Sequence, residues 1–274
     1  LPVDSGLPYT YEIVGNTVTI TDCEETASGE LVIPGTIDGR LVTAIGKDAF
    51  RDCRGLTSIT IPGKVESIGD YAFLNCTSLT SFNVASSNRF FSSENGVLFN
   101  KEKSELIVCG GGKTGNYVLP ESVKIIGNAG FGFCVSLTGI MLHDKLNTIG
   151  EYAILNCVEL KDIIIPSSVK SIGDYAFRDC KNLNSILLQG NAPTLGLSPF
   201  SRISPEAKIY VASTATGFGE TFGGLPVDSG LPYTYEIVGN TVAITDCDET
   251  VSGELVIPGT IEGKPVTSIG AEAV

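Results

Sequence analysis

Apolar residues recur at fixed positions along most of the chain, in the order Ile-Gly-x-x-Ala-Phe-x-x-Cys-x-x-Leu-x-x-Ile-x-Ile-Pro-x-x-Val. The first full copy covers residues 45–65, and further copies begin at Ile68, Ile126, Ile149 and Ile172. The glycines of consecutive copies are evenly spaced, at positions 46 and 69 and again at 127, 150 and 173. This periodicity predicts stacked coils, because one such segment cannot bury its apolar stripe without neighbours.

Each coil divides into a strand and a return segment. Ile59 and Ile61 should point inward along a short strand, which ends at Pro62 because proline cannot donate a further ladder hydrogen bond. Gly69 is expected to permit the following bend, and Asp70 to stabilise the start of a short helical or 3-10 turn. Coils of about 23 residues are typical of leucine-rich repeats. We therefore predict an α/β repeat fold, namely a leucine-rich-repeat solenoid forming a right-handed superhelix of short strands, short helical turns and β-hairpin insertions.

A second, longer period divides the chain into units. Residues 1–50 return as residues 225–274 with ten differences. Recent tandem duplication explains this similarity. The sequence therefore predicts one complete unit at 1–224 and the start of a second unit at 225–274. Within the first unit we expect an N-terminal hairpin and cap at 1–44, followed by repeat coils at 45–188. The period is lost at 189–224, which we interpret as a C-terminal cap and linker.

Two segments of the unit predict β-hairpins. The interval from Cys76 to Cys134 is longer than two regular coils and leaves room for one enlarged coil. Within it, apolar runs around a polar turn predict a hairpin insertion at 85–116 that protrudes from the solenoid, followed by a flexible exit at Gly110–Gly112. The hairpin expected at residues 9–21 would cover the open end of the first coil, as repeat arrays require.

The repeat resembles a known family. Its Ala-Phe-x-x-Cys-x-x-Leu-x-x-Ile-x-Ile-Pro coil, the lead-in at Leu31–Gly39 and the insertion at Asn95–Phe99 are similar to the BspA-type leucine-rich-repeat proteins. That resemblance covers essentially the whole chain. It implies a secreted or cell-surface protein of a bacterium or a protozoan parasite, in a family with several members implicated in attachment to host matrix proteins, host cells or other microbes. Departures are Ile154 and Val274 where Phe is expected, and Gly130 where Ala is expected.

Charge and hydropathy narrow the choice of partners. The chain has 18 Lys plus Arg against 31 Asp plus Glu, a formal net charge of −13, which opposes binding to nucleic acid or anionic lipid. The most apolar stretch, Ile163–Ile165, ends at Pro166, far short of the roughly 20 residues that cross a bilayer. We expect any signal peptide to have been removed or to lie upstream of Leu1. The expected partners are proteins, of the host extracellular matrix or of microbial surfaces, or a second copy of the chain.

Cysteines are the most conspicuous candidates for chemistry. Five of the eight share one repeat position and should form an inward-facing ladder of free thiols: Cys53, Cys76, Cys134, Cys157 and Cys180. Disulfides are the alternative, since neighbouring coils bring such residues about 5 Å apart, but parallel Cβ vectors suit that bond badly. Cys23, Cys109 and Cys247 are expected to lie outside the ladder.

Other motifs favour neither metal, cofactor nor catalysis. His143 is the only histidine and is expected at a solvent-facing turn, so no Cys/His or Ser/His/Asp arrangement can be built. Gly110–Thr114 lacks the spacing of a phosphate-binding loop. Acidic residues recur at the return segment, where calcium binding is the alternative to stabilising a turn: Asp48, Asp70, Glu151 and Asp174, with Asn128 in the remaining coil.

The outward face of the predicted sheet carries the candidate binding site. Residues between the inward isoleucines form a row that reads Thr60, Asn83, Met141, Ile164, Leu187, bordered by the row Ser58, Ser81, Gly139, Asp162, Ser185. An apolar strip with a polar border is typical of a protein-binding patch. We predict that Met141, Ile164 and Leu187, with Asp162 and Ser185 beside them and Phe99 of the protruding hairpin, contact a partner. Alternatively, the C-terminal cap, a neighbouring unit or a homodimer covers the strip.

These observations predict a non-catalytic adhesion or recognition module. A structural spacer, whose repeated units hold another domain away from the cell, is the alternative. A spacer requires uniformly polar faces, and the apolar strip therefore favours recognition.

Overall fold

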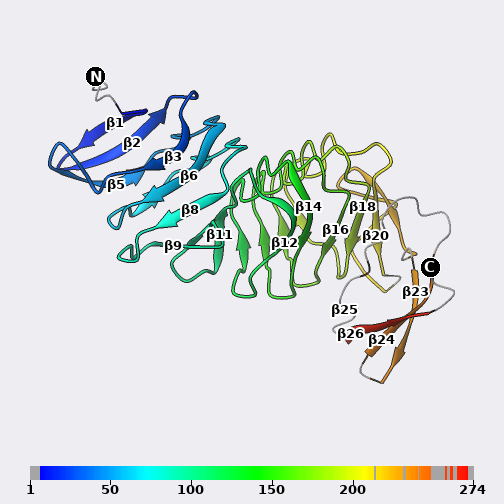
Figure 1. Cartoon of the computed structure of the whole chain (residues 1–274). Coiled ribbons are helices and arrows are strands. Elements are labelled where there is room, and N and C mark those ends of the chain that lie inside the picture. The colour runs from blue at the N-terminus through cyan, green and yellow to red at the C-terminus, as the bar shows by residue number, and fades with distance from the viewer. Residues whose placement is uncertain are drawn as a thin grey trace.

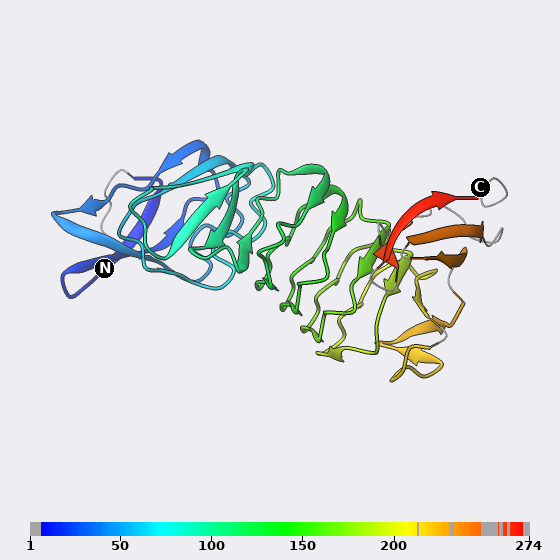
Figure 2. The ribbon, with the colours of Figure 1, turned by 90° about the horizontal axis from the view of Figure 1, so that it is seen from below.

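The structure is a computed structural model that describes residues 7–212, 214–230, 233–239, 241–247, 257, 260–261 and 264–270. These residues form strands and turns, with no helix among them. The coils stack along one axis over residues 9–211, and the strands that follow residue 232 lie at the C-terminal end of this stack (Figures 1 and 2). Val274, where the sequence departs from the repeat, lies outside the described residues.

Two stacks of parallel strands form two walls of the solenoid. The first contains β3 (Ser28–Val32), β6 (Gly55–Ile61), β8 (Ser81–Val84), β12 (Thr114–Val118), β14 (Ser136–Met141), β16 (Asp162–Ile165), β18 (Ser185–Leu188) and β20 (Lys208–Val211). The second contains β2 (Thr17–Cys23), β5 (Arg40–Ile45), β7 (Ser67–Ile68), β11 (Glu105–Val108), β13 (Ile125–Ile126), β15 (Thr148–Ile149), β17 (Ser171–Ile172) and β19 (Thr194–Leu195). Additional strands are β1 (Tyr9–Val14), which pairs with β2, and β4 (Thr36–Ile37), which pairs with β5.

The register of both stacks follows the sequence period. Ile163 pairs with Ile186, and Ile149 pairs with Ile172, so both stacks advance by the spacing of the repeated glycines. Along each strand the inward isoleucines are buried, as in β16, where Ile163 and Ile165 face the core. The predicted solenoid of stacked strands is therefore confirmed.

The third wall of the solenoid consists of turns. The prediction of short helical or 3-10 segments was therefore wrong, and so was the prediction of an α/β repeat fold. Two residues of each return segment have a left-handed backbone, for example Tyr71 with φ 60° and Asn75 with φ 62°. A helix cannot continue through such residues. Alternate N–H groups donate instead to the next coil, as from Phe50 to the Ala72 carbonyl at 2.7 Å. The return segments are thus hydrogen-bonded between coils rather than within a helix.

The insertion does not protrude from the solenoid as predicted. β10 (Val97–Asn100) pairs antiparallel with β9 (Phe91–Glu94) on one side and with β11 on the other, and β11 joins the second stack through β13. Side chains on the two faces of β10 enter different cores: Leu98 joins the N-terminal cluster, whereas Val97 and Phe99 join the C-terminal one. The insertion is therefore an internal wall between two halves of the core.

The glycine segment after the insertion is packed rather than flexible, contrary to expectation. The N–H of Gly112 donates to the Leu79 carbonyl at 3.0 Å. A Cβ at Gly111 would lie 2.9 Å from the carbonyl oxygens of both Cys76 and Phe133. Glycine is required here because two coils approach the backbone from both sides.

Repeat register continues beyond position 188, where the sequence predicted a cap. β19 pairs with β17, and β20 pairs with β18 through Ile186 and Ile209, at the same step as the preceding coils. The sheet is then closed by β22 (Leu225–Asp228), which pairs with β20 and forms a hairpin with β21 (Thr221–Phe222). The first residues of the second sequence copy therefore belong to the sheet of the first unit.

This shared strand gives a testable prediction. Val227→Asp should lower the stability of the first unit by about 1–3 kcal/mol, because Val227 packs on its core and an unpaired carboxylate there is costly. Val3→Asp is the control. Val3 lies in the first copy of the same Leu-Pro-Val-Asp-Ser-Gly segment, and within residues 1–274 no repeat coil equivalent to that of β20 comes before it. Urea unfolding followed by circular dichroism should separate the two variants. Equal midpoints would contradict a structural role of β22 in the first unit.

Candidate functional site

The predicted strip is part of a longer apolar row on the outer face of the first stack. Register pairs Val118 with Met141, and Ile164 with Leu187 and then Tyr210. The structure thus places the three predicted residues on one face and extends the row at both ends. Val118 and Tyr210 were not predicted from the sequence. Both lie on strands of the same stack, where Val118 pairs with Met141 and Tyr210 pairs with Leu187.

The two ends of the row differ in exposure. Val118 and Met141 are 65% and 58% exposed, whereas Leu187 is only 6% exposed. Ile164 and Tyr210 are half-buried. The open end of the row therefore lies on β12 and β14, and the covered end on β16, β18 and β20.

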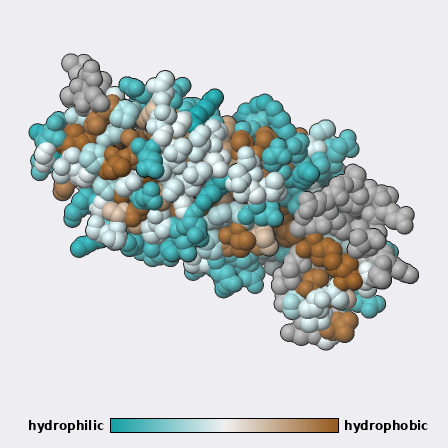
Figure 3. All heavy atoms as spheres, in the orientation of Figure 1, coloured by the Kyte–Doolittle hydropathy of each residue, from teal (hydrophilic) through white to brown (hydrophobic). Residues whose placement is uncertain are grey.

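The opening hairpin of the second unit covers that end. It consists of β23 (Tyr233–Val238) and β24 (Thr241–Cys247), and β24 pairs with β26 (Lys264–Ile269), next to β25 (Thr260–Ile261). Tyr233, Val242 and Ile244 are buried in one cluster with Leu187. The same burial raises the pKa of the Tyr233 hydroxyl, which keeps it neutral. Figure 3 shows hydrophobic surface on this hairpin beside the first unit.

A row of polar residues and Gly139 runs beside the strip on the same sheet. Asp162 pairs with Ser185, which pairs with Lys208, while Asn116 pairs with Gly139. The Thr138 hydroxyl donates to the Asn116 side-chain oxygen at 3.0 Å across β12 and β14. The border therefore has uncharged hydrogen-bonding groups beside the open end, on β12 and β14, and charged residues of both signs beside the covered end, at Asp162 and Lys208.

Phe99 does not belong to this surface. It is fully buried and packs in the C-terminal core, because its strand β10 lies between β9 and β11 inside the wall. The expectation that Phe99 contacts a partner required a protruding hairpin and is therefore wrong.

The cysteine ladder is buried and its thiols are free, as expected. Each thiol is held by the preceding coil: the Cys180 Sγ–H donates to the Ile154 carbonyl at 2.8 Å, and the Cys157 Sγ–H to the Phe131 carbonyl at 3.1 Å. Burial raises the pKa of the Cys76 thiol well above its usual range. Protonated thiols of this kind are poor nucleophiles and poor metal ligands.

Two further cysteines extend this ladder, against expectation. The Cys53 thiol contacts the Cys23 carbonyl at 3.8 Å, and the Cys134 thiol contacts the Cys109 carbonyl at 3.5 Å. Sequence spacing hid them because Cys23 belongs to the cap and Cys109 to the enlarged coil. The side chain of Cys247 lies outside the described residues.

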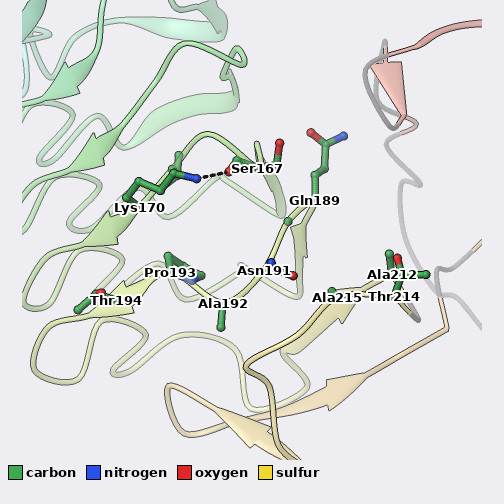
Figure 4. Close-up of a pocket in the computed structure, with 12 residues that line it drawn as sticks. Ser167, Lys170, Gln189, Asn191, Ala192, Pro193, Thr194, Ala212, Thr214 and Ala215 are labelled. Atoms are coloured by element: carbon green, nitrogen blue, oxygen red, sulfur yellow. Dashed lines mark hydrogen bonds between the residues drawn. The ribbon is translucent and has the colours of Figure 1, made fainter.

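A hollow of about 590 Å³ lies between the loops that precede β17 and β19 and the loop that follows β20 (Figure 4). Lys170 is the one ionisable side chain among the described residues that line it, and its Nζ donates to the Ser167 carbonyl at 3.2 Å. The Asn191 side-chain oxygen accepts from the Thr216 N–H at 2.9 Å. These polar groups therefore stabilise the loops, and they provide no acid–base pair.

A second hollow of about 380 Å³ lies where the insertion meets the return segments. Tyr71, Glu105 and Ile125 are among its lining residues, and burial raises the pKa of the Glu105 carboxyl. Within the described part of the chain, no three His, Cys, Asp or Glu side chains are grouped to hold a metal ion.

The acidic row of the return segments links coils. Asp174 Oδ1 accepts the Leu197 N–H at 2.6 Å, and Asn128 Oδ1 accepts the Glu151 N–H at 3.1 Å. His143 is half-buried, with its Nε2 2.8 Å from the Pro120 carbonyl oxygen. The side chains of the acidic row and His143 therefore stabilise turns, and none of these hydrogen bonds joins them to a nucleophilic side chain.

No helix of the described residues could cross a membrane.

Stacked coils at a constant step, with parallel strands in two walls and turns in the third, define this protein as a leucine-rich-repeat solenoid. The model of the BspA type Leucine rich repeat region matches six copies in residues 35–105 and 110–222. The chain therefore belongs to the BspA-type leucine-rich-repeat family.

A solved structure of a bacterial protein has the same fold. A leucine-rich repeat protein from Eubacterium ventriosum is 18% identical, with 77% of this chain and 78% of that chain covered and a TM-score of 0.55. A leucine rich cell surface protein from Faecalibacterium prausnitzii is 16% identical, with coverages of 84% and 99% and a TM-score of 0.42. The pneumococcal vaccine antigen PcpA is 17% identical, with coverages of 78% and 94% and a TM-score of 0.33. No curated protein is significantly similar in sequence to this chain.

Proposed function

We propose that this chain is a non-catalytic recognition module of a secreted or cell-surface protein, and that it binds another protein through the open end of the strip. The carrying observation is that Val118 and Met141, neighbours on paired strands, are 65% and 58% exposed. Adjacent exposed apolar side chains with a polar border can serve as a binding anchor once a partner excludes water from them.

The scaffold suits such a role. Parallel strands β12 and β14 are paired from Thr114 to Val118, with one shift of register between Gly115 and Asn116, so the anchor residues need little ordering on binding. The net charge of −13 favours a partner with a basic contact surface, by attraction at long range. Proteins of the host extracellular matrix and of microbial surfaces are the candidate partners. The buried thiols and the engaged histidine support a non-catalytic role.

A structural spacer is the second candidate function, and the contacts between the two units favour it. Leu187 is buried by the hairpin of the second unit, and β22 of that unit closes the sheet of the first. The covered end of the strip therefore joins consecutive units, as a stalk of repeated units requires. Partner binding at the open end of the strip is therefore what distinguishes a recognition module from a structural spacer.

Binding of the full chain to immobilised fibronectin, fibrinogen and whole bacterial or epithelial cells tests the proposal. Val118→Asp combined with Met141→Asp should weaken saturable binding by about thirtyfold, which corresponds to the loss of about 2 kcal/mol expected at an interface anchor. These changes leave the buried Leu187 untouched, so the unit junction should stay intact.

Val32→Asp is the matched control. Val32 is also 65% exposed and pairs with Thr60 on the same face, but it lies in the N-terminal half, where the row is polar. Circular dichroism should confirm that all variants are folded. Binding that is lost equally in the Val32 control, or retained by the double variant, would refute the assigned surface. Absence of binding by the wild-type chain to every probe would favour the spacer.

A further inference from the structure

The two copies of the opening hairpin use one apolar face against different partners. In the first unit, Tyr9, Val18 and Ile20 lie in the N-terminal core. The Tyr9 ring meets Phe50 of the first coil edge-on, with 6.4 Å between ring centroids. This hairpin therefore caps its own solenoid.

The second copy places the corresponding residues elsewhere. Tyr233, Val242 and Ile244 are the counterparts of Tyr9, Val18 and Ile20 in the repeated sequence. They are packed on Leu187, with Ile164 and Tyr210 at the edge of the cluster. The hairpin thus covers the sheet of the preceding unit instead of a first coil of its own.

Both positions bury the face completely, so the hairpin cannot occupy both. Val18 and Ile20 are 0% exposed in the first unit, and Val242 and Ile244 are 0% exposed in the second. No apolar surface of these side chains is left for a further partner in either arrangement. The two contacts are therefore mutually exclusive for any one hairpin.

We infer that the opening hairpin is an exchangeable cover, which packs either on the first coil of its own unit or on the strip of the preceding unit. β22 holds it within reach of the strip, because Val227 is paired with Ile209 and only the segment 229–232 separates β22 from β23 in the sequence. The occupant of the covered end is thus the opening hairpin of the following unit.

This exchange would control access to the strip. When the hairpin packs on its own coil, Ile164, Leu187 and Tyr210 join Val118 and Met141 in one continuous apolar surface. When it packs on the strip, only the last two remain open. The exchange itself does not depend on the proposed function, whereas its consequence for partner binding rests on it.

A single tryptophan can report on the cover, because the chain has no Trp of its own. Leu187→Trp in the full chain should give a residue protected from acrylamide quenching, compared with Met141→Trp as the exposed reference. Adding Val242→Asp should raise quenching of Trp at 187 toward that reference. Val238→Asp is the matched control, since Val238 lies in the same hairpin, is 61% exposed, and should leave quenching unchanged.

The exchange is tested by giving the second copy its own coils. Residues 51–224 are appended after position 274, with Val274→Phe supplying the counterpart of Phe50, and Leu187→Trp is retained. Quenching should rise as it does in the Val242→Asp variant. Protection that persists in the extended chain, or that is unaffected by Val242→Asp, would overturn the inference. Because no partner is present, these outcomes are independent of the binding test above.

Discussion

Phe177→Ala should destabilise the protein by about 3–5 kcal/mol, the usual range for removing a buried aromatic side chain. Phe177 is fully buried and stacks on Phe200 of the next coil, with 5.4 Å between ring centroids and 25° between planes. Removing the ring leaves a cavity between coils whose backbones are fixed by hydrogen bonds, such as Phe177 N–H to the Pro199 carbonyl at 2.8 Å. The neighbouring coils therefore have little freedom to close it.

Phe177→Ile is the matched variant, because Ile154 occupies the same repeat position naturally and is fully buried. It should cost less than half as much as the alanine variant, since most of the volume is kept. Urea unfolding followed by far-ultraviolet circular dichroism measures both. A loss below about 1 kcal/mol for alanine, or equal losses for the two variants, would show that this ring does not fill the core as described.

Gly173→Ala should also destabilise the protein strongly, and for a different reason. A Cβ at this position would lie 2.6 Å from the carbonyl carbon of Gly150 and 2.7 Å from the nitrogen of Glu151. Both atoms are backbone, so the neighbouring coil must shift and weaken the hydrogen bond from the Gly173 N–H to the Ile149 carbonyl. We expect a cost of about 1–3 kcal/mol, as for other overpacked sites, and a lower melting temperature.

Gly35→Ala is the control for this variant. A Cβ at Gly35 meets no atom within 4 Å, and the residue is exposed. Its melting temperature, measured by circular dichroism, should stay near that of the wild type. If both alanine variants melt together, close approach of coils is not the reason for the glycine at position 173.

The repeated glycine is required for close packing of neighbouring coils rather than for a bend. The sequence suggested that Gly69 permits a bend, yet neither Gly69 nor Gly173 has a positive φ. Glycine occurs there because the next coil lies against it, a long-range contact that no local pattern reveals. Residues that do adopt left-handed conformations are instead Tyr71, Asn75 and their equivalents, and of these only Asn or Asp offers a sequence hint.

The candidate site was predictable only in part. Strand alternation correctly placed Met141, Ile164 and Leu187 outside the inward ladder, because successive residues of a strand point to opposite faces. It could not say which of them is covered, since Leu187 is buried by residues far along the chain, as at Tyr233. Phe99 was misplaced because a strand buried on both faces has no polar alternation to mark its surroundings.

The amino-acid sequence was sufficient to predict the repeat, its constant step, the inward ladder of Ile, Phe and Cys, and the duplication of residues 1–50. These follow from side-chain periodicity, which each coil expresses locally and its neighbours reinforce. Four features became visible only in the folded chain: the return segments are turns, β10 divides two cores, β22 closes the preceding unit, and one hairpin face has two partners. Those features depend on which apolar surfaces and backbone groups compete for burial and pairing across the fold, and a local pattern does not encode that competition.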